Sequence, residues 1–322
     1  MKTKLTIAIL FSLVYYFGLT NPTYSQTANP DMWVTNGLVN AIVVDGDYTY
    51  IGGSFTYVGP NTGSGTKITT TSTQPSSSFP KVNGSISCSV SDGSGGWYIG
   101  GNFTKVGSYT RNYIAHILSD GSVDATWDPN ANNLVYSIAI NGSDIYAGGQ
   151  FTSIGGQTRN YIAKLNNTNG SADAAWNPNA NAFVRSIAIS GSDIYVGGEF
   201  TSIGGQTRNH ISKLNNTNGL ADATWNPNAN NIIRSIIISG SDIYAGGNFT
   251  SIGGQSRNRI AKLNNTDGLP DATWNPNANS TVTSIAISGS DVYVGGSFTS
   301  IGGQSRNRIA KLNTTSGIAD AT

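Results

Sequence analysis

One stretch decides the fold of this chain: residues 197–215 read GGEFTSIGGQTRNHISKLN. Its core, Gly-Gly-x-Phe-Thr with a glycine four residues after the phenylalanine, recurs along the whole chain. The phenylalanines of the copies are spaced by 48, 48, 49, 49 and 49 residues; they are Phe55, Phe103, Phe151, Phe200, Phe249 and Phe298. A period this regular indicates a repeat architecture in which each copy is one supersecondary unit.

Each unit divides into four short extended runs. In the fourth copy they cover residues 184–190, 194–200, 209–215 and about 223–225, and Gly191-Ser192-Asp193 joins the first two as a hairpin. Four strands in a unit of about 50 residues are typical of a β-propeller blade. The rival is a β-solenoid, whose coils are usually shorter and lack a tight hairpin in every repeat. We predict an all-β propeller of about six four-stranded blades.

Composition favours the same fold class. Only 11% of the 322 residues are charged, 40 are glycine, and Glu199 is the only glutamate. Such a chain suits turn-rich β structure and argues against long helices. In residues 186–189, Ser-Ile-Ala-Ile, both faces of the strand carry compact uncharged side chains. This pattern predicts sheets pressed face to face, as blades are.

The N-terminus predicts export. Residues 1–25 combine Lys2 and Lys4, an apolar run and small residues at a cleavage site, as a signal peptide does, and the run is short for a membrane span. Residues 26–322 are then the propeller domain, with an irregular first repeat at about 39–82. Without the two lysines the mature chain has 16 basic and 17 acidic residues, so no basic field would attract nucleic acid, and we expect no membrane span in it.

Several motifs together resemble a known family. Gly-Gly-x-Phe-Thr-x-x-Gly, Arg-Asn-x-Ile-Ala-Lys-Leu-Asn, Asn-Gly-x-x-Asp and Trp-Asn-Pro resemble the delta-60 repeat, a bacterial β-propeller repeat of unknown function, over residues 28–322. The resemblance implies an exported or surface protein, commonly larger than this chain, and no catalytic residues. The first repeat departs from the pattern because it lacks Arg-Asn, and the unit is shorter than is usual in the family.

The C-terminal end leaves the number of complete blades open. The tryptophans Trp127, Trp176, Trp225 and Trp274 recur every 49 residues, and Thr322 stops one residue before the next would come. We expect the sequence to be a piece of a longer protein. The alternative is that a strand around Trp33 completes the last blade.

Most polar residues recur in every repeat, which assigns them first to the fold. The arginines of one series are expected to bond backbone carbonyls or the repeated aspartates, with an anion-binding ring as the sharper alternative; they are Arg111, Arg159, Arg208, Arg257 and Arg306. His116 and His210 have no partners at metal-ligand spacing, and no acidic loop series suits calcium. Cys88, aligned with Ile189, is expected to be a small buried residue. We therefore predict no catalytic residue, no metal and no cofactor, although a glycosidase carboxylate pair among the aspartates stays an alternative.

One position near the start of the first run varies between otherwise similar repeats. It reads Asn40, Gly84, Tyr136, Arg185, Arg234 and Thr283. If the first strand is innermost, these residues surround one mouth of the central channel and could bind a glycan or peptide by stacking and forked hydrogen bonds. A tolerant solvent-facing position is the simpler interpretation. A second variable set, expected on the outer surface, is Tyr113, Tyr161, His210, Arg259 and Arg308.

These observations favour an exported, non-catalytic binding or structural module at the cell surface. Its partner would be a glycan or protein, and the chain would be a monomer or part of a longer chain. The alternative is a carbohydrate-active enzyme or lectin that uses the channel mouth, since propellers host both kinds of function.

Overall fold

The computed structural model describes residues 34–36, 38–45, 48–54, 58–59, 63–64 and 79–320. The chain divides into two compact units, Met1–Asn61 and Thr62–Thr322. The predicted signal peptide, the Trp33 strand and the end of the chain after residue 320 lie outside the described residues. That residues 26–322 form one domain stays a prediction. Within the described ranges, no helix has the length and apolar character to cross a membrane.

The first unit contains two antiparallel strand pairs. The pairs are β1 (Val34–Thr35) with β4 (Val58–Gly59), and β2 (Val39–Asp45) with β3 (Tyr48–Gly53). The register of the second pair shifts between Val39 and Ala41, which is a β-bulge next to the Gly52-Gly53 pair. Because the later repeats have the same bulge, β2 and β3 correspond to the first two strands of a repeat.

The second unit contains five repeats, each built on a three-stranded antiparallel core with the second strand in the middle. The first strands are β5 (Val82–Ser91), β9 (Val135–Asn141), β14 (Val184–Ser190), β19 (Ile233–Ser239) and β24 (Val282–Ser288). The second strands are β6 (Trp97–Val106), β10 (Asp144–Gly149), β15 (Asp193–Gly198), β20 (Asp242–Gly247) and β25 (Asp291–Gly296). The third strands are β8 (Ile114–Ile117), β13 (Ile162–Asn166), β18 (Ile211–Asn215), β23 (Ile260–Asn264) and β28 (Ile309–Asn313).

A fourth strand position completes each repeat. It consists of a single residue that bridges to the third strand, for example Ala221 to Leu214, so the unit is four-stranded as predicted. The prediction that the fourth strand lies at about 223–225 is wrong, because Ala223 is in a bend and Trp225 is buried in the core of the repeat that follows.

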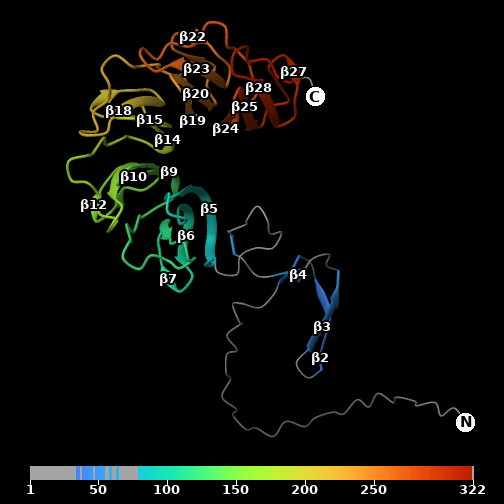
Figure 1. Ribbon diagram of the computed structural model, residues 1–322. Helices are drawn as coiled ribbons and strands as arrows, with labels where there is room; N and C mark the ends of the chain where they lie inside the picture. The colour runs from blue at the N-terminus through green and yellow to red at the C-terminus, as the bar shows by residue number, and fades with distance from the viewer. Residues whose placement is uncertain are drawn as a thin grey trace, which may run out of the picture. The chain divides into compact units, whose positions relative to one another are not determined.

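The structure contains one element that was not predicted from the sequence. A short hairpin precedes each third strand; the later ones pair β11 (Ser153–Ile154) with β12 (Gln157–Thr158), β16 (Ser202–Ile203) with β17 (Gln206–Thr207), β21 (Ser251–Ile252) with β22 (Gln255–Ser256), and β26 (Ser300–Ile301) with β27 (Gln304–Ser305). In the repeat of β5, β7 (Tyr109–Thr110) pairs with the end of β6 instead. These hairpins lie on the outer side of the row of repeats and the first strands on its inner side (Figure 1).

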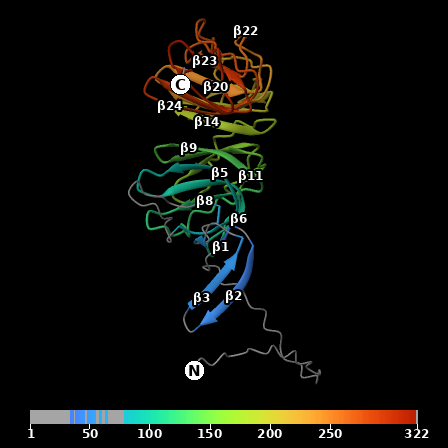
Figure 2. The same cartoon turned by 90° about the vertical axis from the view of Figure 1, so that its right-hand side faces the viewer.

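The core lies between consecutive sheets. Tyr195 and Ile211 of one repeat pack with Trp225, Ile233 and Ile236 of the next, and the same cluster recurs in the other repeats. Figure 2 shows sheets such as those of β9 and β14 lying one over the other. The predicted face-to-face packing is therefore confirmed, with glycines such as Gly197 allowing the close approach.

Neighbouring first strands are also linked by a serine hydroxyl. Ser186 Oγ accepts a hydrogen bond of 2.9 Å from the Ile236 amide of the next repeat. Ser137 and Ser235 make the same bond to Ile187 and Ile285, at 3.0 and 3.2 Å. Each link satisfies an amide that the sheet itself leaves unpaired, which fixes the register of one blade on the next.

Cys88 takes the place of this serine in the earliest repeat. The register pairs Cys88 with Gly100 as it pairs Ser186 with Gly197, so the alignment of Cys88 with Ile189 is wrong. Residues 92–96 separate Ser91 from its partner Trp97, whereas only residues 191–192 separate Ser190 from Asp193, and this longer hairpin displaced the alignment. Burial raises the pKa of the Cys88 thiol to about 12, although the Gly100 and Ile138 amides oppose the shift. The Cys88 side chain is half-buried, not fully buried as predicted, and packs against the core cluster that contains Trp127 and Val135; the raised pKa disfavours the reactive thiolate.

The last sheet differs from the others in what covers it. Tyr293 is 41% exposed and Ile309 is 70% exposed, whereas the equivalent Tyr244 and Ile260 are 1% and 0% exposed. The sequence of this repeat is unchanged at these positions, so the difference comes from its place in the described unit. The face of β24, β25 and β28 that corresponds to a covered face elsewhere is open.

Candidate functional site

The recurring charged residues serve the fold. Lys213 lies 2.8 Å from Asp222 and 3.8 Å from Asp193, and equivalent lysines repeat this arrangement. In the earliest repeat His116 replaces the lysine, with Nδ1 3.0 Å from Asp124 and Nε2 3.2 Å from Asp92. Among the described residues, no group of three or more His, Cys, Asp or Glu side chains has an arrangement that could hold a metal ion.

The repeated arginines donate hydrogen bonds to backbone carbonyls, as expected, and do not form the alternative anion-binding ring. Arg208 is buried and donates from Nη1 to the Thr207 carbonyl at 2.8 Å and from Nη2 to the Asp222 carbonyl at 2.6 Å. Arg159 and Arg257 make the same bonds. Their guanidinium groups stabilise the turn before the tryptophan. These donors are therefore used within the fold.

The Lys–Asp pairs make a prediction for acid stability. Burial alone would raise the pKa of the Asp222 carboxyl, but Lys213, the Thr224 and Trp225 amides and the Thr224 hydroxyl lower that pKa well below its usual value. Asp271 behaves in the same way. We expect the free energy of unfolding to be constant above about pH 5 and to fall below about pH 4, because unfolded carboxyls with a pKa of about 3.9 bind protons first.

Urea unfolding at pH 2 to 7 checks this expectation. The double variant Asp222→Asn/Asp271→Asn should be less stable at pH 7 and show a flatter dependence on pH than the natural chain. Asp267→Asn, which changes an exposed acid, should leave the dependence unaltered. An equally steep decline in the double variant would assign the acid sensitivity to other groups.

The predicted variable residues occupy a β-bulge at the start of each first strand. The register shifts around Tyr136, Arg185, Arg234 and Thr283, and around Asn40 in β2 of the first unit. A bulge turns its extra side chain away from the regular alternation of the strand. In the repeat of β5 this bulge lies between Ile86 and Cys88, so Ser87, not Gly84, belongs to the set.

These side chains contact one specific partner in their own repeat. Arg185 Nε donates to Glu199 Oε1 at 2.7 Å, and Nη2 also contacts that oxygen. Arg234 Nε donates to Asn248 Oδ1 at 2.7 Å, and Gln150 Nε2 donates to the Tyr136 hydroxyl. Each of these partners is the residue between Gly-Gly and Phe-Thr. Sequence reasoning missed this position, although it varies between repeats as Ser54, Asn102, Gln150, Glu199, Asn248 and Ser297.

Residues of adjacent repeats also meet. The Arg185 guanidinium lies over the Tyr136 ring, 5.0 Å from its centroid. The first strands that carry them are adjacent, since Ile187 of β14 bonds Ser137 of β9. The structure thus brings Tyr136 and Arg185 together, and places Arg234 and Thr283 at the same end of the next two strands. Thr283 bonds the Gly295 carbonyl at 3.2 Å.

The second variable set lies beside the first, so its predicted place on the outer surface is wrong. These residues directly precede the third strand, and four of them are half-buried. His210 Nδ1 is 3.3 Å from the Gly198 carbonyl, and Arg259 Nη1 donates to the Asn248 carbonyl. Burial lowers the pKa of His210, which the Gly198 carbonyl and the Glu199 charge partly offset. We call the bulged residues of the second unit, their partners and this set together the rim.

The backbone at the second set is strained. Its φ angles lie between 64° and 68° for Tyr113, Tyr161, His210, Arg259 and Arg308. A side chain in this left-handed region costs about 1 kcal/mol relative to glycine. Large side chains that differ from repeat to repeat are nevertheless present at this position. Such strain is a feature of ligand clamps as well as of tight turns.

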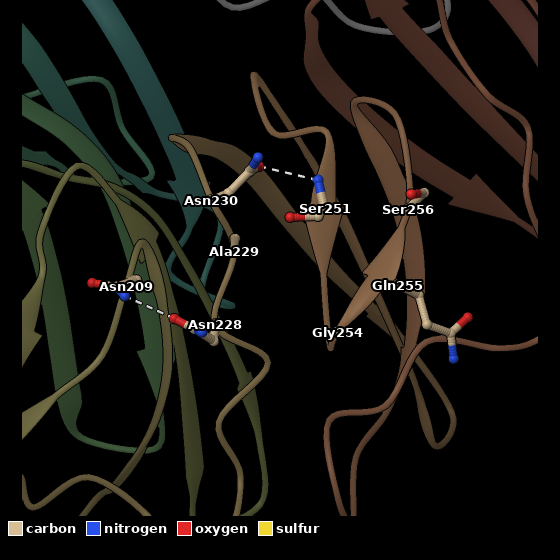
Figure 3. A pocket seen from close by; sticks show the side chains of 8 residues that line it. All are labelled: Asn209, Asn228, Ala229, Asn230, Ser251, Gly254, Gln255 and Ser256. Atoms are coloured by element: carbon tan, nitrogen blue, oxygen red, sulfur yellow. Dashed lines mark hydrogen bonds between the residues drawn. The ribbon is translucent and has the colours of Figure 1, made fainter.

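A second candidate is a polar pocket on the outer hairpins. It has a volume of about 350 Å³, and its lining includes Asn209, Asn228, Asn230 and Gln255 (Figure 3). Asn209 Nδ2 donates to Asn228 Oδ1 at 2.7 Å, and Asn230 Oδ1 accepts from the Ser251 amide at 3.0 Å. In the preceding repeat, the equivalent asparagine side chains make the same kind of hydrogen bond near a pocket of about 540 Å³. Because this lining recurs with the fold, the rim is the stronger candidate.

The five repeats and the stacked sheets define a β-propeller repeat protein. A family model described as a domain of unknown function (DUF5122) beta-propeller matches residues 93–126, 144–175, 193–224, 242–273 and 291–322. The chain belongs to this family. The predicted resemblance to a β-propeller repeat of unknown function is therefore confirmed.

One of two similar solved structures supports the fold, and the fold alone. The crystal structure of the computationally designed Ika8 protein is similar with a TM-score of 0.52 and 11% identity, over 87% of this chain and 72% of that one. The designed Ika4 protein gives a TM-score of 0.41 and 10% identity, over 59% of this chain and 98% of that one. No curated protein matches the chain significantly.

Proposed function

We propose that the protein is an exported, non-catalytic binding module whose ligand contacts the rim. The observation that supports this proposal is the concentration of variation in one place. Each of the five repeats of the second unit keeps its core, its ion pair and its carbonyl-binding arginine, while the three rim positions change, and Arg185 of one repeat meets Tyr136 of its neighbour. A site that binds an asymmetric ligand on a repeated scaffold needs such differences between repeats.

The rim chemistry suits recognition better than hydrolysis. It offers aromatic rings, amides and guanidinium forks, which bind polar ligands with defined geometry. Glu199 is the carboxylate of the rim among the described residues, and Arg185 holds it at 2.7 Å. Glycoside hydrolysis needs a pair of carboxylates at a set separation, and the rim does not assemble one. Export enters this proposal from residues 1–25 of the sequence alone.

A glycan and peptide array tests the proposal. We expect the natural chain to bind a subset of the array and the double variant Arg185→Ala/Arg234→Ala to lose about tenfold or more in affinity, since hydrogen bonds to charged groups contribute about 1.5–3 kcal/mol each. Lys105→Ala removes an exposed charge on β6 and should bind like the natural chain. Thermal unfolding of each variant controls for folding.

Two results would contradict the proposal. If the double variant binds as tightly as the natural chain, the ligand does not contact the rim. If no glycan or peptide binds at all, a scaffold role becomes the better account.

A further inference from the structure

The charge on the rim is unevenly distributed between repeats. The repeat of β9 contributes Tyr136, Gln150 and Tyr161, which are uncharged. The repeat of β14 contributes the Arg185–Glu199 ion pair together with His210, whose lowered pKa leaves it neutral at pH 7. In the repeats of β9 and β14, therefore, the rim carries no net charge: the first offers aromatic and amide groups, and the second an arginine that is already paired with a glutamate.

The repeat of β19 is different because it carries two arginines and no acid. Arg234 Nε donates to the Asn248 side-chain oxygen at 2.7 Å, and Arg259 Nη1 donates to the Asn248 main-chain oxygen. The two guanidinium groups thus contact the same residue, one from β19 and one from the position before β23. Among the described residues, neither forms an ion pair with a carboxylate, in contrast to Arg185.

This geometry leaves donors available. Each guanidinium has five N–H groups, and the bonds to Asn248 use one from each. Both side chains are half-buried, so solvent screens them less than it screens fully exposed groups. Two adjacent half-buried arginines without a counterion favour an anion that accepts forked hydrogen bonds, such as a carboxylate.

The backbone at Arg259 is constrained. Its φ of 66° lies in the left-handed region, as it does at the equivalent Tyr113, Tyr161, His210 and Arg308. Because tyrosine and histidine occupy this position in other repeats, the fold does not require an arginine there. The strained backbone holds the guanidinium against Asn248, next to Arg234.

We propose that Arg234 and Arg259 form the anion subsite of the rim and that its ligand is a carboxylate-bearing oligosaccharide. This inference rests on the proposed binding function and specifies its ligand class. A carboxylate of one sugar residue binds the two arginines, while a ring further along the oligosaccharide packs on the aromatic region at Tyr136 and bonds the amide of Gln150. The ligand would cross the repeat of β14, since the Ile236 amide of β19 bonds Ser186 of β14 at 2.9 Å and the Ile187 amide of β14 bonds Ser137 of β9 at 3.0 Å.

Calorimetric titration of the full chain with oligogalacturonate and with its methyl ester tests the inference. The pair has the same sugar rings and differs in charge. We expect the acid to bind at least about tenfold more tightly than the ester at low salt, with the preference reduced at high salt. Arg234→Gln and Arg259→Gln should each remove most of the preference, because each variant weakens binding of the acid more than binding of the ester. Lys105→Gln is the control for the loss of one positive charge and should retain the preference.

Each other outcome overturns the inference in a distinct way. Equal binding of the acid and the ester, abolished in Arg185→Ala, would refute the anion subsite but keep the rim as a binding site. Tighter binding of polyglutamate than of oligogalacturonate would assign the subsite to acidic peptides. Retention of the acid preference in both glutamine variants would place the anion elsewhere. If none of these probes binds, both the subsite and its saccharide ligand are refuted, and the array then decides separately whether the rim binds any other class.

Discussion

Replacing Trp225 with alanine is expected to lower the free energy of unfolding by about 4 kcal/mol, the usual range for a fully buried aromatic residue being about 3–5 kcal/mol. The side chain is 0% exposed and lies in the cluster between the sheets of β15 and β20. Its indole Nε1 donates to the Asn264 carbonyl at 2.9 Å, and the Tyr195 ring packs against it edge-on at 5.2 Å. The alanine variant loses the packing and leaves the Asn264 carbonyl without this donor.

Hydrogen exchange is the appropriate measurement, because repeat proteins unfold locally and a single transition need not describe them. We expect the amides of β18, β19 and β20 to lose protection before those of β9 and β10. Trp225→Phe keeps most of the ring and should cost about 1–2 kcal/mol, mainly for the lost hydrogen bond. Trp97→Ala changes a half-buried residue outside the regular tryptophan series and should cost less than Trp225→Ala. Uniform loss of protection along the chain would contradict the local effect.

The sequence was sufficient for the architecture because the repeat encodes it six times. Hairpin glycines, alternating apolar residues and the 49-residue period predict the first three strands of each unit, and the structure has them in the five repeats of the second unit. The short hairpin of β16 and β17 was not predicted, although Gly204 and Gly205 at its turn have φ angles of 62° and 75°. Adjacent glycines between two short runs are a recognised hairpin signal, so this element could have been found.

The candidate site was predictable only in part. Variation between repeats was enough to find Tyr136, Arg185 and Arg234, because a single sequence with internal repeats can be compared with itself. The partners of these residues, at the position between Gly-Gly and Phe, were missed. Each partner lies 14 residues further along the chain, and only the register of the bulged strand pair brings the two side chains together. Register also explains the error at Gly84, because the longer hairpin between β5 and β6 displaced the alignment of the whole first strand.

Replacing Gly197 with valine is expected to lower the free energy of unfolding by about 3 kcal/mol, near the upper end of the range for overpacking a core. A Cβ at this position would lie 2.5 Å from Ile233 Cγ2 and 3.0 Å from Ile236 Cδ1, both on the next sheet. The equivalent distances from Gly148 and Gly246 to the next sheet are 2.5 and 2.6 Å. The two sheets would have to separate, and the bond between Ser186 and Ile236 would lengthen from 2.9 Å. Thermal unfolding and exchange at the Ile236 amide measure the effect.

Gly295→Val is the matched control because it makes the same substitution on the same strand of the last repeat. There the nearest atom to an added Cβ is Ser284 Cβ at 3.8 Å, since no further sheet lies over this face within the described unit. The valine should change stability by less than about 0.5 kcal/mol, as surface substitutions usually do, and valine suits a strand. If Gly295→Val is as destabilising as Gly197→Val, then the face of β24, β25 and β28 is covered in solution. A neutral Gly295→Val beside a destabilising Gly197→Val would show that close packing of one blade on the next, and not the glycine pair as such, imposes the requirement for glycine.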